Sequence, residues 1–187
     1  MPSLPVCRFP HPVLTKVAEP VVDFDRELQK IIKNLIDTMY SGPGTVGLAA
    51  PQIGISKRIF VADVSKKDPA KSLKVFINPE IISWAEPKPN REGCLSLPDY
   101  TGNVMRAQRL SIKALDEEGR VIERTTEGLE AVCWQHEVDH LNGLLFIHRV
   151  TNLKTDDKNY PTWKRYKQNL QIFCGPHYYV MGFLFRR

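Results

Sequence analysis

Apolar residues between positions 25 and 40 fall on one face when this segment is drawn as a helix. Such a one-sided stripe predicts an amphipathic helix that packs against a core. Asp23 or Asp25 can cap its start, and the Ser-Gly-Pro-Gly sequence at 41–44 can end it. Core packing accounts for this helix, so we assign it no chemistry.

A second helix is predicted from about Glu127, because apolar residues again recur at helical spacing. Thr126 is a plausible cap for this helix, and Gly143 can end it. Between the two helices, runs of alternating and β-branched apolar residues predict strands. These strands lie at 58–64, 73–78 and 80–84, followed by a hairpin of strands 110–115 and 120–124 around a turn at 116–119.

Several antiparallel strands and two helices predict an α+β fold, with antiparallel or mixed β-sheets packed around a central buried helix. We expect the second helix to be the buried one, because Leu129, Val132 and Cys133 lie near its polar residues. Residues 1–150 should form this domain. Residues 151–187 should form a basic tail that contains a short helix, a terminal strand or both.

The composition of the 187 residues is that of an ordinary globular protein, and no stretch is apolar enough for a membrane span. Prolines near the N-terminus interrupt the apolar run that a secretory signal would need. The four cysteines are widely spaced, which argues against a disulfide framework and favours a reducing compartment. We therefore expect a cytoplasmic protein of bacterial type, with an organelle as the alternative, and neither DNA nor a membrane as partner.

The positive charge of the chain is concentrated at its end. Residues 151–187 hold seven of the 26 Lys and Arg residues and two of the 21 Asp and Glu residues. The rest of the chain is balanced, so the whole excess of +5 lies in the tail. A neutral body with a cationic tail predicts a polyanionic surface as partner.

The sequence Gln-His-Glu-Val-Asp-His at 135–140 places the pattern His-Glu-x-x-His inside the second predicted helix. Residues four apart lie on one helix face, so His136 and His140 can present two imidazole nitrogens to one metal ion. Glu137 is close enough to exchange a proton with a water activated by that ion. This pattern predicts metal-assisted hydrolysis, and the alternative is a solvated helix whose charges met by chance.

A catalytic metal needs a third protein ligand. In one metalloprotease class a third His would fall at Phe146, and we interpret the nearby His148 as structural. Another class uses a Glu downstream of the helix, and the rest of the chain contains none. A thiolate remains. We favour Cys94, which comes from a separate segment, over Cys133, which would share one helix surface with both imidazoles.

The small and nearly uncharged segment 47–54 allows two interpretations. It is either a turn packed under the core or a backbone edge that approaches a substrate, with Gln52 donating to a developing oxyanion.

Three motifs resemble those of the peptide deformylases, in order and spacing: VGLAAPQ at 46–52, EGCLS at 92–96 and QHEVDH at 135–140. The opening segment, with FPHPVL at 9–14, is also similar to that family. The resemblance covers about residues 5–150. It implies a hydrolase that removes the formyl group from the N-terminal formylmethionine of new polypeptides and releases formate, with N-formylmethionyl peptides as its partners.

The resemblance also implies roles for matching residues. Cys94, His136 and His140 would be metal ligands, and Glu137 the general acid and base. The Gln52 amide and the Leu95 backbone N–H would form an oxyanion hole. Val46 and Gly47 would line the peptide cleft, whereas Leu129, Val132 and Cys133 would form the methionine pocket. Glu92 and Arg106 would form a supporting ion pair. The implied metal is one iron(II) ion per chain, with nickel, cobalt or zinc able to substitute.

Two departures from the family pattern stand close to the site. Thr45 occupies a position that is usually Gly, and Thr101 one that is often Arg, which predicts weaker contacts to the peptide backbone. The basic residues at 162–172 could form a short helix that docks on the ribosome. Two rival functions remain at this point: a broader metallopeptidase, and a non-catalytic, metal-stabilised module that binds the ribosome or RNA.

Overall fold

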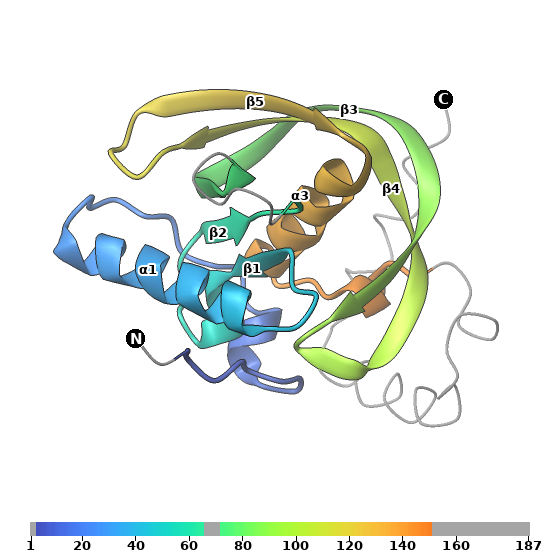
Figure 1. Cartoon of the computed structure of the whole chain (residues 1–187), viewed down its shortest axis with the longest axis horizontal. Coiled ribbons are helices and arrows are strands. Elements are labelled where there is room, and N and C mark those ends of the chain that lie inside the picture. Colours follow the sequence, from blue (N-terminus) through green and yellow to red (C-terminus); the bar gives the residue numbers. More distant parts are fainter. Residues whose placement is uncertain (1–2, 66–71, 151–187) are drawn as a thin grey trace.

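The computed structural model describes residues 3–65 and 72–150 (Figure 1). Its helices are α1 (Arg26–Ser41) and α3 (Gly128–Leu141), with short 3-10 turns η1 (Pro12–Thr15), η2 (Ala50–Ile53) and η3 (Phe146–His148). Its strands are β1 (Gly47–Ala49), β2 (Ile59–Ala62), β3 (Lys74–Cys94), β4 (Leu97–Leu115) and β5 (Val121–Glu127). The predicted tail, residues 151–187, lies outside the described residues.

Helix α1 begins and ends where the sequence predicts. Of the two candidate caps, Asp25 is the one used, because its Oδ1 accepts hydrogen bonds from the backbone N–H groups of Glu27 at 2.9 Å and Leu28 at 3.0 Å. These bonds satisfy donors that have no partner inside the helix. The helix ends at Ser41, where Gly42 is the C-cap.

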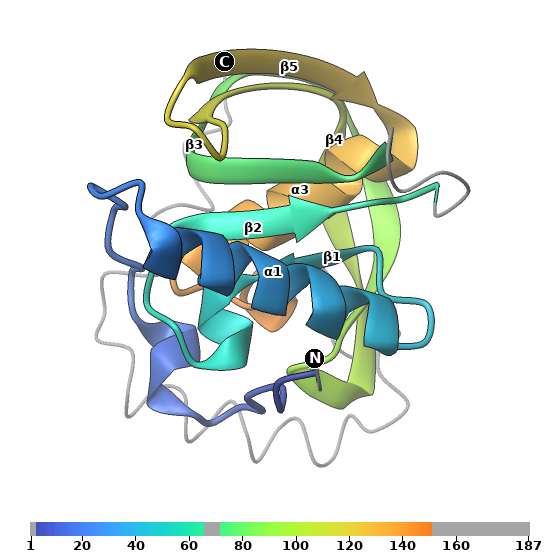
Figure 2. The same ribbon diagram turned by 60° about the vertical axis from the view of Figure 1, so that its left-hand side comes forward.

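The five strands form one antiparallel sheet in the order β1-β2-β3-β4-β5, which confirms the predicted α+β fold. Successive residues of a strand point to opposite faces. In β2, Phe60 and Ala62 pack on the side of α3, whereas Ile59 and Val61 pack on the side of α1. Figure 2 shows α1 in front of β1 and β2, with α3 behind them. This part of the sheet is therefore buried on both faces, which explains why β2 is continuously apolar.

The sequence revealed only parts of the two longest strands, β3 and β4. The predicted strands 73–78 and 80–84 are parts of one strand, β3, which runs on to Cys94 and pairs with β4 along nearly its whole length. Most of its residues between 82 and 91 are exposed, so no buried face leaves an apolar pattern to read. The register shifts at three places, and such bulges bend the hairpin around α3 (Figure 1).

Helix α3 is buried among the strands, as predicted, with Trp134 and Leu141 almost fully enclosed. Two details of the prediction are wrong. Thr126 does not cap the helix, because it lies in β5 and Glu127 is the N-cap. Leu129 is 62% exposed because it belongs to the first turn, before the helix enters the core.

Gly143 follows the end of α3 at a φ of +70°. A Cβ at this position would lie 2.9 Å from the backbone of Thr15 and Lys16, so only glycine fits. In the described part of the chain, no helix is both long and apolar enough to cross a membrane.

Candidate metal centre

One thiol and two imidazoles converge at the inner side of α3. The potential ligand atoms of Cys94, His136 and His140 all lie within 4.8 Å of one another, and Cys94 Sγ is 3.3 Å from His140 Nε2. In the part of the chain that the structure describes, no fourth His, Cys, Asp or Glu belongs to this cluster. Three ligands with an open position are typical of a catalytic zinc or iron site rather than of a structural one.

Two different elements bring these side chains together. His136 and His140 are one helical turn apart on α3, and their ring centroids are 5.0 Å apart. Cys94 is the last residue of β3, where the register shifts just before the tight turn to β4. The predicted preference for a ligand from a separate segment agrees with this placement.

Glu92 orients the ring of His136. Its Oε2 lies 2.8 Å from His136 Nδ1, so a proton on Nδ1 leaves Nε2 free to bind a metal. Burial alone would raise the pKa of Glu92, but hydrogen bonds from His136 and Arg106 lower it to about 2. The carboxylate is therefore charged, and a charged carboxylate behind a metal-binding histidine is a common arrangement in metal centres.

The two candidate cysteines have opposite environments. Burial raises the pKa of the Cys94 thiol, but the neighbouring His140 and His136 outweigh it and hold this pKa well below its ordinary value. Burial raises the pKa of the Cys133 thiol far above its ordinary value, and the nearby Glu137 adds to the effect. Because metals bind thiolates, these environments fit Cys94 as a ligand and Cys133 as a neutral thiol.

Glu137 is a buried carboxylate with one oxygen unused. Within residues 3–65 and 72–150, its Oε2 has no hydrogen-bond partner. Burial raises its pKa to about 7, against the opposing influence of His136 and His140. A pKa near neutrality suits a group that takes up and returns a proton.

Gly47 approaches this carboxylate closely. A Cβ at position 47 would lie 2.6 Å from Glu137 Oε1 and 2.7 Å from Cys133 Sγ. The lack of a side chain at Gly47 is thus what leaves room for Glu137. Val46 is next to it, and its carbonyl accepts from the Cys133 thiol at 3.6 Å.

A hydrogen bond at its carbonyl oxygen orients the Gln52 side chain so that its amide nitrogen faces Cys94. Its Oε1 accepts from the backbone N–H of Ala49 at 2.9 Å, which places Nε2 on the opposite side, 3.6 Å from Cys94 Sγ. Nε2 also lies 3.4 Å from Ser96 Oγ. Segment 47–54 is largely packed in the core, and it also points the Gln52 amide toward Cys94. Donation from Gln52 to an oxyanion stays a prediction. Leu95 lies in the turn between β3 and β4, beside Cys94.

The residues implied for substrate binding are not equally close to the metal ligands. Val132 and Cys133 are buried on α3, one helical turn before His136 and Glu137 respectively, whereas Leu129 is exposed in the first turn. Among the strands of residues 3–65 and 72–150, β1 is at the edge of the sheet, and one side of its backbone is not paired with another of these strands.

The structure shows the surroundings of Thr45 and Thr101, the two departures from the family pattern. Thr45 is buried, and its hydroxyl has no hydrogen-bond partner among the described residues. Thr101 lies diagonally across the hairpin from Arg91, whose Nη2 donates to the Thr101 hydroxyl at 2.5 Å. A cation is therefore present beside Thr101, although it comes from the other strand.

Sequence reasoning found the Glu92–Arg106 pair but missed the residues that extend it. Arg106 also donates to Asp139 Oδ2 at 2.6 Å, and Arg149 donates to both oxygens of Asp139. The position of Asp139 inside the motif at 135–140 was the one feature of the sequence that could have pointed to it. His148, which we interpreted as structural, accepts a hydrogen bond from the Leu145 backbone N–H at 2.9 Å.

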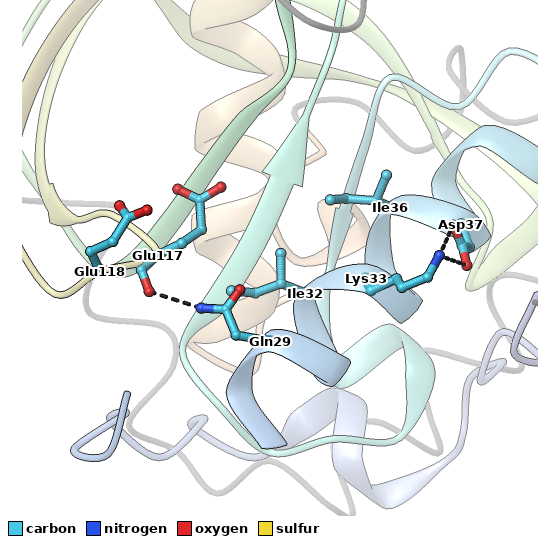
Figure 3. Close-up of a pocket in the computed structure, with 7 residues that line it drawn as sticks. All are labelled: Gln29, Ile32, Lys33, Ile36, Asp37, Glu117 and Glu118. Carbon is cyan, nitrogen blue, oxygen red and sulfur yellow. Dashed lines mark hydrogen bonds and ion pairs between the residues drawn. The ribbon is translucent and has the colours of Figure 1, made fainter. Parts of the chain in front are cut away.

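A surface pocket between α1 and the turn from β4 to β5 lies apart from these residues (Figure 3). It is lined by Gln29, Ile32, Lys33, Ile36, Asp37, Glu117 and Glu118. Lys33 is paired with Asp37, and Gln29 donates to the Glu117 carbonyl. None of the predicted site residues lines it.

Comparisons with known proteins agree on one family. The model of the family described as Polypeptide deformylase matches residues 3–156. A peptide deformylase from Mesorhizobium japonicum is 46% identical over 157 residues, which cover 83% of this chain and 89% of that protein. The crystal structure of a Legionella pneumophila peptide deformylase is 41% identical with a TM-score of 0.77, and covers 89% of this chain and 98% of its own. A Synechococcus elongatus peptide deformylase in complex with actinonin is 39% identical with a TM-score of 0.75, covering 81% of both chains.

Proposed function

The chain belongs to the peptide deformylase family, and from this premise we propose that Cys94, His136 and His140 hold its catalytic ion and that Glu137 moves the proton. The chain is a metal-dependent hydrolase that removes the N-formyl group from nascent polypeptides. The observation that carries the residue assignment is the cluster of one thiol and two imidazoles within 4.8 Å beside a buried carboxylate.

When bound, the metal supplies a Lewis acid that makes water more acidic and polarises the formyl carbonyl. Glu137 accepts a proton from the water that adds to the formyl carbon. The same carboxyl then returns this proton to the amine nitrogen as the C–N bond breaks, which gives formate and a free N-terminal methionine. Its raised pKa, about 7, lets one group perform both transfers.

The oxygen of the formyl group gains negative charge when water adds. We assign the Gln52 Nε2–H and the Leu95 backbone N–H as the donors to this oxygen. The bond from Ala49 N–H to Gln52 Oε1 supports this, because it holds the amide in the orientation that faces Cys94. No rotation of Gln52 is then needed during the reaction.

The edge strand β1 suits an extended peptide, which would add to the sheet next to Val46 and Gly47. Leu129, Val132 and Cys133 would contact the methionine side chain. The partly exposed Leu129 would then lie at the rim of this pocket and the two buried residues further in. Arg91 donates a hydrogen bond to Thr101, so it offers a positive charge near the position where the family often has an arginine.

The experiment that tests the activity is release of formate from a formyl-Met-Ala-Ser peptide. The protein is stripped of metal with a chelator, assayed, reloaded with iron(II) under argon and assayed again. We expect formate only from the reloaded protein. Acetyl-Met-Ala-Ser and the unmodified peptide are the controls. Cleavage of peptide bonds in the unmodified peptide would favour a broad metallopeptidase, and metal uptake with no formate would favour a non-catalytic module.

We propose iron(II) as the native metal, with zinc, nickel or cobalt able to replace it, because a thiolate with two imidazoles binds all four. Iron(II) and the Cys94 sulfur can both be oxidised, so the iron-loaded enzyme should lose activity in air. The nickel-loaded enzyme, whose metal is not readily oxidised, is the matched control. Equal survival of the iron and nickel forms in air would contradict this proposal.

We also propose that residues 1–150 are the catalytic domain and that the basic residues of 151–187 dock on the ribosome in a bacterial-type cytoplasm. The support is the charge distribution of the chain, whose excess of +5 lies wholly in the tail. Replacing Lys164, Arg165 and Lys167 by Gln should weaken co-sedimentation with ribosomes and leave formate release from a short peptide unchanged. Undiminished co-sedimentation would argue against this role.

A further inference from the structure

A row of four charged side chains leads from the metal centre to the molecular surface. Glu92 contacts His136, Arg106 contacts Glu92, Asp139 contacts Arg106, and Arg149 contacts Asp139. The signs alternate along the row. The first three side chains are nearly fully buried, whereas the side chain of Arg149 is 42% exposed.

Each link of this row has a fixed geometry. Arg106 donates from Nε and Nη2 to the two oxygens of Glu92, at 2.7 and 3.1 Å. Arg149 donates from Nε and Nη2 to the two oxygens of Asp139, both at 2.6 Å. Paired hydrogen bonds of this kind fix the plane of the carboxylate as well as its distance. The orientation of one group is thus passed to the next.

In each of these two paired contacts, one carboxylate oxygen also bonds to the next group towards the metal centre. Asp139 Oδ2 accepts from both Arg149 Nε and Arg106 Nη1. Glu92 Oε2 accepts from Arg106 Nη2 and also faces His136 Nδ1. A displacement of Asp139 would therefore move Arg106, then Glu92, and finally the imidazole that Glu92 holds.

The charges of the row balance only when Arg149 is included. Two carboxylates face two guanidinium groups, whereas without Arg149 the buried Asp139 and Glu92 would share the single positive charge of Arg106. An uncompensated buried carboxylate is unfavourable, and the side chains around it would rearrange. Arg149 is also the only member outside the β3–β4 hairpin and α3, since it directly follows η3.

We propose that Arg149 is a positioning residue for the ligand His136, acting through Asp139, Arg106 and Glu92. This inference rests on the proposed ligand set, and it assigns a role in metal binding to an arginine that contacts Asp139 rather than any of the three proposed ligands. Arg149 fixes Asp139 from the surface side of the row. Without Arg149, His136 is less firmly held and the ion is less tightly bound.

The test is the rate at which a chelator removes cobalt(II) from the loaded, folded protein. Arg149→Met keeps most of the aliphatic part of the side chain and removes the two hydrogen bonds to Asp139. We expect metal loss to be about tenfold faster, at the low end of what outer residues of metal centres contribute. The thiolate-to-cobalt absorption band should shift or broaden as the ligands become less ordered, while KM for the formyl peptide stays near the wild-type value.

The matched control is Arg120→Met. Arg120 also binds acidic residues, Asp116 and Glu118, but in the exposed turn between β4 and β5. Its rate of metal loss should equal that of the wild type. Circular dichroism at the assay temperature shows that each variant is folded. A rate for Arg149→Met within twofold of wild type would overturn the proposal, even if its melting temperature had fallen.

Arg149→Lys separates geometry from charge and carries the test if the Met variant does not fold. Lysine keeps the charge but cannot form the two-pronged contact. We expect its metal loss to be faster than wild type, and an unchanged rate would overturn the claim that this contact positions His136. Failure of the underlying ligand set has a different signature, because His136→Ala would then lose metal no faster than the wild type.

Discussion

Gly47→Ala should remove most of the activity without removing the metal. The added Cβ would lie 2.6 Å from Glu137 Oε1 and 3.0 Å from Glu137 Cδ, whereas ordinary contacts begin at 3.4 Å. Glu137 Oε1 must therefore move away by about 0.8 Å, the difference between 2.6 Å and 3.4 Å. A displacement near 1 Å in an active site can lower the rate about a hundredfold. That factor corresponds to about 2.7 kcal/mol of lost transition-state stabilisation.

The assay is steady-state formate release, with metal content measured on the same samples. We expect the fall in kcat/KM to come mainly from kcat, because the displaced group moves the proton. Metal content should stay at the wild-type level, since the three atoms nearest the new Cβ belong to Glu137 and Cys133 and not to the ligands.

The Cys133 thiol offers an internal control. The added Cβ would also lie 2.7 Å from Cys133 Sγ. In Gly47→Ala/Cys133→Ala this second clash is gone, whereas the clash with Glu137 remains. The double variant should therefore stay about as inactive as the single one. Cys133→Ala alone should keep its kcat and change only KM, because we place Cys133 in the methionine pocket and not among the groups that move the proton. A Gly47→Ala enzyme within about twofold of wild type, or a crystal structure with an unmoved carboxylate, would refute the reasoning.

Two further predictions concern single groups. Glu137→Gln should bind metal as the wild type does and lose about 10² to 10⁴ in kcat, the usual contribution of a general acid and base, so an active variant with full metal content would contradict its role. Burial and the hydrogen bond to Asp63 raise the pKa of Tyr40 to about 12, from 10.0 in the unfolded chain, so its contribution to stability is complete below pH 10 and is lost as the pH rises towards 12. Urea unfolding between pH 9 and 12 should therefore show a steeper loss of stability in the wild type than in Tyr40→Phe, and parallel losses would count against this assignment.

The parts of the fold that the sequence predicted are those with a buried face. Helix α1 and strand β2 pack against the core, so burial leaves a periodic pattern of apolar residues in each. Most of β3 between Ile82 and Arg91 faces solvent, and only its pairing with β4 keeps it extended. Pairing between distant residues has no local signature, which is why this hairpin was missed.

The site shows a similar division. The metal ligands and Glu137 could be named because their chemistry requires particular residue types at a fixed spacing. Asp139 and Arg149 serve only by their charge and position, so an arginine ten residues beyond Asp139 looks like any surface arginine. The close approach of Gly47 to Glu137 was also hidden, because glycine has many uses and the sequence does not show what lies against it.

The most direct test of the proposed centre is anomalous diffraction at the absorption edge of the metal in crystals of the loaded protein. One peak per chain is expected, bonded to Cys94 Sγ and to one nitrogen each of His136 and His140, with Glu137 near it but not coordinated. A peak located away from these three side chains, or one bonded to Cys133 in place of Cys94, would contradict the assignment.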